Sequence, residues 1–376
     1  MRPTMKYLAA TMAAAVVTTL TACGVVGGSA AGDTVYFGVS GPVTGPNAEY
    51  GRLWKQGFDL ALDKVNAEGG INGKKVDLKW EDSQSDPKQT APIAQKFVND
   101  SSVIAELGDF SSPASMAASP IYQQRRVVQY GFTNSHPDFT KAGDHIWSPS
   151  LTQQFFQREN AKIVSKRAKK VSVVYQQTDW GKTAFDIFSA AAKDLGVSIV
   201  YSSPFLTDST DFRPILIQAR DAAPDAVVHL GYGPDGALIV KQLRDLGFTG
   251  QFFGGQNTPE FLRLAGSAAE GDLITGTFVG SDPRPEVQSF VSAFRAKYHE
   301  EPGEFNVYAY DALSTLVTAA RNGGASRDGV QKGLTEGQGF PSVQFGTLSF
   351  DGQRRPKDVV ARELIVKNGV FVLNQA

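Results

Sequence analysis

Strand-like and helix-like segments alternate along the chain from Val35 onward, and this alternation limits the fold more than any other feature. Residues 34–42 form an apolar run that ends in a Gly-Pro loop, as buried strands do. Residues 50–70 place Trp54, Phe58 and Val65 on one helical face, and two glycines stop the helix. An Asn-Gly turn at 72–73 leads into the next strand. Such alternation predicts a parallel sheet with right-handed crossovers.

A second set of alternating segments begins after about Ser150. Helices are expected at 155–168, 181–196, 211–223 and 234–247, with strands between them, and long helices follow at 285–298 and 307–321. Two strands around a turn are expected to close the chain. Two sets of this kind predict two α/β lobes. Because ligands bind beyond the carboxyl ends of parallel strands, the cleft between the lobes is the expected site.

The sharpest local motif is "GDFSSPAS" at 108–115. A strand is expected to end at Phe110 and a helix to begin at Pro113, which makes Ser112 the candidate N-cap. The Ser112 hydroxyl, with the free N–H groups of the first helical turn, can hold a carboxylate. Helix capping alone explains the motif equally well.

The segment "YGFTNSHP" at 130–137 leaves the next strand at the same edge of the sheet. Gly131 offers a carbonyl to a ligand, and Thr133 offers a hydroxyl and an N–H. An ordinary loop with turn-forming residues is the alternative.

Three aromatic residues occupy matching places in the two lobes, where strands give way to helices: Tyr50, Trp180 and Tyr232. Asp179 is available to cap the helix that carries Trp180. Any one of these rings is more simply explained by packing. Together they favour a pocket with apolar walls.

Motifs for enzymatic chemistry are scarce. The four histidines lack metal-ligand spacing, and the chain has no G-x-S-x-G elbow, phosphate-binding loop or dinucleotide-binding glycine motif. We therefore expect neither catalysis nor a metal or other cofactor. An exported hydrolase is the competing hypothesis, and it would need a nucleophile and a base.

The start of the chain predicts export. Arg2 and Lys6 precede an uncharged apolar run at 7–20, followed by "LTAC" at 20–23. Residues 1–22 are thus expected to be a signal peptide. The pattern resembles the lipobox of bacterial lipoproteins, which makes Cys23, the only cysteine, the expected lipid attachment site. Residues 23–32 would then tether the anchor to the fold. An ordinary signal with an incidental cysteine is the alternative.

Charge and hydropathy restrict the partners. The formal charge is −1 and becomes −3 when Arg2 and Lys6 leave with the signal, so a nucleic-acid partner is not expected. No later stretch approaches 18 apolar residues, so no further membrane span is expected.

The ordered motifs of residues 34–373 resemble the periplasmic leucine/isoleucine/valine-binding proteins, the type I solute-binding subunits of ABC importers. The resemblance rests on "GPVTGPNAEYG", "NAEGGINGKKV", "DSQSDPKQT", "SSPASMAASPIY", "FTNSHPDFT", "DWGKTAFD", "TDFRPILIQAR" and "QLRDLGFTGQFFG". It implies the type I periplasmic-binding-protein fold, with two doubly wound parallel-sheet lobes joined by three crossovers. One lobe would comprise 33–150 and 280–350, and the other 151–279 and 351–376.

The resemblance also implies a function. The chain would be a monomeric, lipid-anchored protein outside the cytoplasm that captures a small hydrophobic amino acid, or a related carboxylate or amide, and passes it to a membrane permease. An aromatic or other non-amino-acid carboxylate is the alternative ligand, and a sensory subunit of the same fold is the alternative role. The implied ligand contacts are Tyr50, Ser112, Gly131, Thr133, Trp180, Tyr232 and Gln256.

Two departures from the family pattern stand out. The disulfide of the enterobacterial members would join positions that correspond to Ser85 and Ser111, so the bridge is absent. The acidic residue that pairs with the ligand ammonium in that family corresponds to the neutral Gln256. A buried ammonium without an anionic partner costs several kcal/mol. The ligand is thus either not a simple amino acid or one whose ammonium meets another acid.

Overall fold

The computed structural model describes residues 34–374. The predicted signal peptide, Cys23 and the tether lie outside the described residues. The described chain contains two large sheets, one of five strands and one of seven, and each sheet with its helices is called a lobe below. Within residues 34–374, no helix combines the length and apolar character that crossing a membrane requires.

The sheet of the first lobe is parallel throughout and has the order β2-β1-β3-β4-β5. Its strands are β1 (Val35–Gly41), β2 (Val76–Asp82), β3 (Val103–Gly108), β4 (Val128–Tyr130) and β5 (Ile146–Trp147). Phe37, Val39 and Leu107 are fully buried, because helices cover both faces of the sheet. The parallel sheet predicted for this half of the chain is confirmed.

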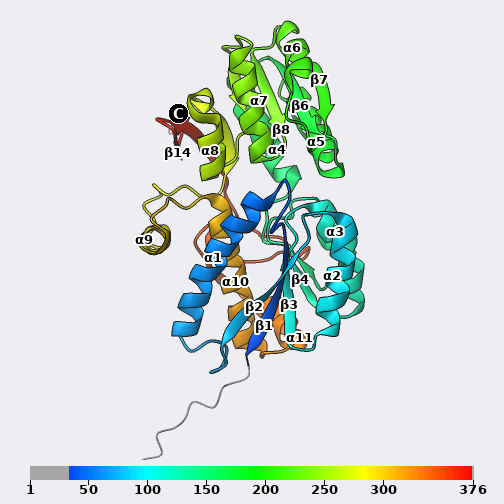
Figure 1. Ribbon diagram of the computed structural model, residues 1–376, viewed down its shortest axis with the longest axis vertical. Coiled ribbons are helices and arrows are strands. Elements are labelled where there is room, and N and C mark those ends of the chain that lie inside the picture. Colours follow the sequence, from blue (N-terminus) through cyan, green and yellow to red (C-terminus); the bar gives the residue numbers. More distant parts are fainter. Residues whose placement is uncertain (1–33, 375–376) are drawn as a thin grey trace, which may run out of the picture. The chain divides into compact units, whose positions relative to one another are not determined.

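Helices α1, α10 and α11 cover one face of this sheet, and α2 and α3 cover the other (Figure 1). The helical segments of this lobe are α1 (Ala48–Ala67), α2 (Pro87–Asn99), α3 (Ser112–Gln124), η1 (Phe139–Ala142), α9 (Pro285–Tyr298), α10 (Glu304–Gly323) and α11 (Arg327–Glu336). A separate hairpin pairs β11 (Phe340–Ser342) with β12 (Gly346–Leu348).

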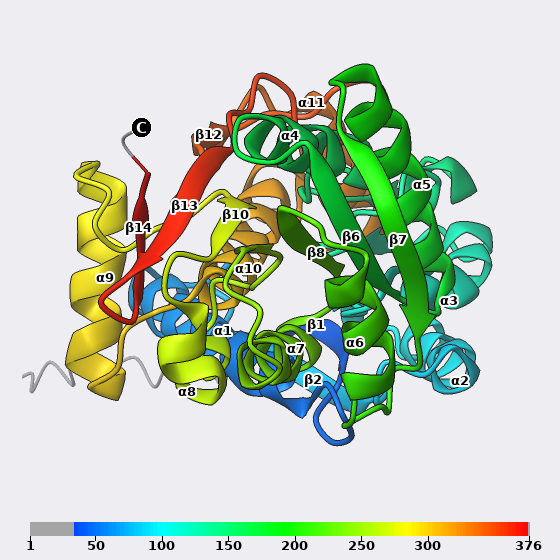
Figure 2. The ribbon, with the colours of Figure 1, turned by 90° about the horizontal axis from the view of Figure 1, so that it is seen from above.

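The sheet of the second lobe has the order β14-β13-β10-β9-β8-β6-β7. Its elements are α4 (Gln153–Ser165), β6 (Lys170–Gln176), α5 (Asp179–Asp194), β7 (Ser198–Phe205), α6 (Arg213–Asp221), β8 (Ala226–Leu230), α7 (Gly233–Asp245), β9 (Gln251–Phe253), α8 (Pro259–Ala265), η2 (Gly266–Ala269), β10 (Leu273–Gly276), β13 (Arg362–Lys367) and β14 (Val370–Leu373). Strands β6 to β10 run parallel, whereas β13 and β14 add an antiparallel edge. Helices α7 and α8 lie on one side of this sheet and α4 on the other (Figure 2).

The chain passes between the two sheets three times, as predicted: after β5, after β10 and before β13. The last passage keeps contact with the first lobe beyond residue 350. The Arg354 guanidinium donates to Ile146 O at 3.0 Å, and Ser148 N donates to Arg354 O at 3.1 Å. We therefore propose that the third crossing begins after Lys357, later than the boundary expected from the sequence.

Candidate ligand-binding site

A cavity of about 170 Å³ lies where the two lobes meet. The first lobe lines it with Phe110, Ser112 and Thr133, which follow β3 and β4. The second lobe lines it with Tyr232 and Gln256, which follow β8 and β9. These are carboxyl ends of parallel strands, the place where open α/β sheets bind ligands. The expected location of the site matches this cavity.

The two serines at the start of α3 have different tasks. Ser111 is the N-cap, with extended backbone angles (φ −88°, ψ 137°), and its hydroxyl accepts from Ala114 N at 3.4 Å. The expectation that Ser112 caps the helix is thus wrong. Ser112 is the first helical residue, lines the cavity and accepts from His136 N at 3.3 Å. Its hydroxyl is therefore free of the capping task and lies at a helix N-terminus, where an anion is favoured.

The loop after β4 reaches the cavity through Thr133 rather than Gly131. Thr133 lines the cavity, and its hydroxyl donates to Phe110 O at 3.0 Å. Gly131 is absent from the described residues that line the cavity, and its carbonyl accepts from the Ser148 hydroxyl at 2.8 Å. The same carbonyl also accepts from Asn134 N at 3.1 Å, so a contact of Gly131 with the ligand would need one of these two bonds to break.

Asp109 fixes the loop that carries Phe110 and Ser112, a role that sequence reasoning missed. Its carboxylate accepts from the hydroxyls of Ser40 and Ser85 at 3.0 Å each, and also from the Ser83 hydroxyl. Burial raises its pKa to about 6, although these hydroxyls oppose the shift. Three strand ends thereby converge on one buried carboxyl group.

The predicted aromatic residues come together, with two further rings. Tyr50 stacks on Phe110 with centroids 4.0 Å apart and meets Phe305 edge-on at 4.7 Å. Tyr232 contacts Phe110 at 4.9 Å and Trp180 at 5.3 Å. Phe110, Trp180, Tyr232 and Phe305 line the cavity, whereas the fully buried Tyr50 lies behind Phe110.

Side-chain contacts join the lobes beside the cavity, and His136 of the first lobe also lies 3.3 Å from the Asp179 carboxylate of the second. The Tyr50 hydroxyl donates to Gln256 Oε1 and accepts from Gly233 N at 2.9 Å. The Trp180 indole donates to the Ser135 hydroxyl at 3.0 Å. The structure therefore has the lobes closed over the cavity. The helix that carries Trp180 is capped by Thr178, which accepts from Gly181 N, so the expectation of an Asp179 cap is wrong.

The cavity extends into the second lobe, between α4 and the sheet. The walls of this extension are mostly apolar: Phe156, Ile163, Val228, Leu230, Phe253, Leu273 and Ile274. An engineered apolar cavity of about 150 Å³ is large enough for benzene. The whole cavity here, of about 170 Å³, is therefore large enough for a branched aliphatic side chain or a single ring. The site thus offers a polar end at α3 and an apolar body in the second lobe.

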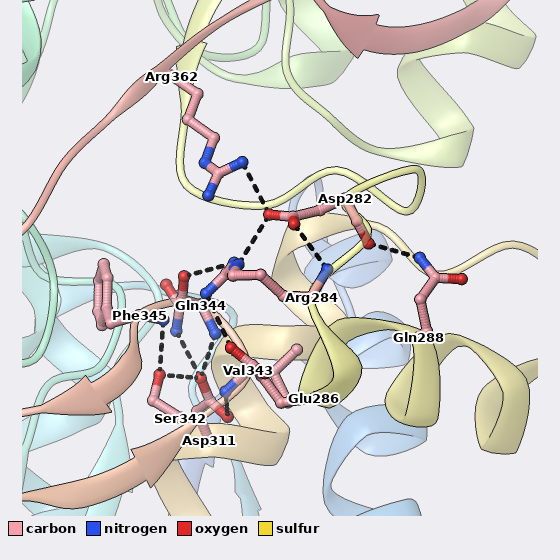
Figure 3. A network of polar contacts seen from close by, with 10 residues as sticks. All are labelled: Asp282, Arg284, Glu286, Gln288, Asp311, Ser342, Val343, Gln344, Phe345 and Arg362. Carbon is pink, nitrogen blue, oxygen red and sulfur yellow. Dashed lines mark hydrogen bonds and ion pairs between the residues drawn. The ribbon is translucent and has the colours of Figure 1, made fainter.

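The two acids nearest Gln256 in the sequence lie outside this cavity. Asp282 is nearly fully buried and pairs with Arg284 at 2.9 Å and Arg362 at 2.8 Å, in a network that extends to Asp311 (Figure 3). Glu260 pairs with Arg263 one turn along α8. Neither acid is among the described residues that line the cavity. The acid that does line it is Glu304, at the start of α10.

Sequence reasoning missed Glu304, Phe305 and the cavity face of α4. Glu304 and Phe305 stand about 50 residues beyond Gln256, in a segment whose pattern indicates only a helix. On α4, Gln153 and Gln157 are buried one helical turn apart and line the cavity with Phe156. Polar residues at this spacing beside apolar ones are a weak signal for a helix that faces a ligand.

A family model described as periplasmic binding protein matches residues 34–369, nearly the whole described chain. The chain belongs to the periplasmic binding protein family. A relative in Brucella melitensis, the Leu/Ile/Val-binding protein homolog 1, is 32% identical over 341 residues, covering 88% of this chain and 90% of the relative.

Solved structures show the same fold. A leucine-binding protein of Thermotoga maritima superimposes with a TM-score of 0.83 at 26% identity, covering 90% of this chain and 97% of that protein. A branched-chain amino acid transporter substrate-binding protein of Streptococcus pneumoniae, in complex with isoleucine, gives a TM-score of 0.84 at 27% identity, covering 91% and 100%. The predicted type I periplasmic-binding-protein fold is confirmed.

Proposed function

We propose that this chain is the solute-binding subunit of an ABC importer of the branched-chain-amino-acid type. The observation that best supports this proposal is the cavity between the carboxyl ends of the strands of the two lobes. It has a helix N-terminus at one end and apolar walls at the other. A carboxylate fits the Ser112 end, and a branched aliphatic body fits the extension beneath α4. The relatives named above, a Leu/Ile/Val-binding protein homolog, a leucine-binding protein and a protein in complex with isoleucine, support the same class of solute.

The proposed mechanism is binding and lobe closure without covalent chemistry. Ligand shifts an existing balance between open and closed lobes by binding the closed form better. Tyr50 and Trp180 make contacts between the lobes in the closed form, and Ser112, Thr133, Tyr232 and Gln256 line the ligand space. A closed protein then presents the solute to a permease.

We also propose that the mature protein is a monomer held outside the cytoplasm by lipid on Cys23. One acyl chain binds a membrane weakly, so the anchor would need more than one chain on this residue. Cells grown with labelled fatty acid should incorporate the label into the wild type and not into a Cys23→Ser variant. Equal incorporation of the label into both proteins would contradict lipid attachment at Cys23.

A thermal-shift screen tests the ligand class. Purified protein lacking residues 1–22 is heated with aliphatic amino acids, aromatic acids, amides and urea-like compounds. Leucine, isoleucine or valine should raise Tm, because a ligand at a hundredfold excess over Kd stabilises the fold by about 2.7 kcal/mol. A rise in Tm with aromatic acids alone would show that the solute is an aromatic carboxylate and not a branched-chain amino acid.

A further inference from the structure

Glu304 gives the cavity its charge. Among the described residues that line the cavity it is the one acid, and none of those residues is Lys or Arg. The His229 side chain is neutral, because burial lowers its pKa to about 4. With Glu304 ionised, the lining therefore carries a single negative charge that no lining side chain balances.

Glu304 is held in place by the second crossing between the lobes. Its Oε1 accepts from Thr277 N at 2.7 Å and from the Thr277 hydroxyl at 2.8 Å. The residue is 8% exposed. Burial raises its pKa, and the bonds from Thr277 and Tyr308 oppose that shift. Thr277 donates twice to this carboxylate, and Tyr308 and Phe278 N also donate to it, so the acid is held in one orientation at the cavity wall.

Gln256, in contrast, is already engaged and neutral. Its Oε1 accepts from the Tyr50 hydroxyl and from Gly233 N at 2.9 Å. It therefore serves the contact between the lobes and supplies no charge to the cavity. An ammonium buried there would still lack an anionic partner, which is costly.

We propose that Glu304 is the counter-ion of the ligand's ammonium group and makes the site selective for zwitterionic amino acids over carboxylates of the same shape. An amino acid would place its carboxylate at the Ser112 end and its ammonium at Glu304. A carboxylate without an amine would add a second negative charge to a cavity that has no cationic side chain. This inference rests on the proposed function, because it assumes that the solute is a small apolar acid or amino acid.

The test combines one substitution with one change in the ligand. Calorimetry measures Kd of leucine and of 4-methylpentanoate, which lacks the amine, for the wild type and for Glu304→Gln. Glutamine keeps an acceptor for Thr277 and removes the charge. Glu301→Gln is the matched control, because Glu301 lies just ahead of α10 and pairs with Arg295 on the surface.

Glu304→Gln should weaken leucine binding about 30-fold or more, since it leaves a buried ammonium unpaired. The same variant should change 4-methylpentanoate binding less than about threefold or improve it, and Glu301→Gln should change both ligands less than threefold. Equal losses for both ligands in Glu304→Gln would show a structural role and overturn the inference.

A comparison within the wild type keeps the inference testable if Glu304→Gln does not fold. Wild-type protein should then bind 4-methylpentanoate far more weakly than leucine, and equal affinity would overturn the inference. If the wild type binds neither compound, the proposed function itself is wrong. The two failures are therefore distinguishable.

Discussion

At the scale of single residues, neighbouring serines show how little separates a structural task from a binding task. Ser111 and Ser112 share chemistry and lie at the same helix start, yet only Ser111 caps it. Backbone angles decide which hydroxyl turns back to the helix, and the sequence does not contain them. The sequence thus predicted the start of this helix correctly and assigned the cap to the wrong serine.

Ser112→Ala should weaken binding of a carboxylate solute by at least ~1.5 kcal/mol, about tenfold, because a hydrogen bond to a charged group is lost. Ser111→Ala is the matched control. It should lower the free energy of unfolding by about 1 kcal/mol through loss of the cap, with a smaller effect on affinity. Calorimetric Kd values and urea unfolding separate the two. Unchanged affinity in Ser112→Ala would show that Ser112 does not bind the carboxylate of the solute.

Glu49 should make the closed form sensitive to pH. Both of its carboxylate oxygens are buried beside Thr258 of the second lobe. Burial raises its pKa to about 7, Glu260 adds to the rise, and Arg52 and Arg263 oppose it. Because the folded pKa is raised, the stabilisation is fully present below the ordinary pKa of 4.5 and is lost as the pH rises through about 7.

Glu49→Gln should remove that loss. Between about pH 4.5 and pH 7, Tm of the wild type should fall relative to Tm of the variant, because folded Glu49 holds its proton over this range and the unfolded chain does not. Glu301→Gln, an exposed change of the same charge, should follow the wild type. Parallel Tm curves for the wild type and Glu49→Gln would show that Glu49 does not titrate in this range.

At the scale of elements, the segment just before the third crossing stabilises the loop that carries Thr133. Arg355 is 4% exposed, and its guanidinium donates to Asn134 O at 2.6 Å and to His136 O at 2.5 Å. Burial lowers its pKa to about 10, so it stays charged near neutrality. A segment far away in the sequence therefore positions one wall of the ligand site.

Arg355→Met should lower the free energy of unfolding by about 2 kcal/mol, since hydrogen bonds from a charged group to two carbonyls are lost. It should also weaken ligand binding, because the loop with Thr133 loses its support. Arg354→Met serves as the comparison, because it removes the bonds to Ile146 and Thr140 and not those to the ligand loop. A larger affinity loss in Arg354→Met than in Arg355→Met would contradict this role.

The sequence predicted the elements better than their partners. The alternation and the Asn72-Gly73 turn were predicted from local patterns, and the structure has both, with Ile71 bridging to Lys74 across the turn. The helix predicted at 285–298 is α9. The antiparallel edge of β13 and β14, the contacts of Arg355 and the place of Glu304 depend on residues distant in the chain. Periodicity reports burial within one element and says nothing of such partners.

At the scale of the whole described chain, closure joins the two lobes around the ligand space. Tyr50 of the first lobe bonds to Gln256 and Gly233 of the second, and Trp180 of the second bonds to Ser135 of the first. These contacts favour the closed form. A ligand that binds the closed form more tightly than the open form shifts the balance further toward closure.

Tyr50→Phe should weaken solute binding about fivefold, the equivalent of about 1 kcal/mol, because the open form gains relative to the closed form. Stability of the lobes should change little, since Gly233 N keeps its bond to Gln256 Oε1. Calorimetry gives Kd, and small-angle scattering gives the size with and without ligand. Unaltered affinity and unaltered size would exclude a closing role for this hydroxyl.

Equilibrium dialysis of the protein lacking residues 1–22 against labelled leucine tests the central claim most directly. The account predicts one leucine retained per protein molecule, displaced by unlabelled isoleucine and valine and not by 4-methylpentanoate at equal concentration. If the protein retains no leucine, isoleucine or valine at any concentration up to the solubility limit of the amino acid, the account is contradicted.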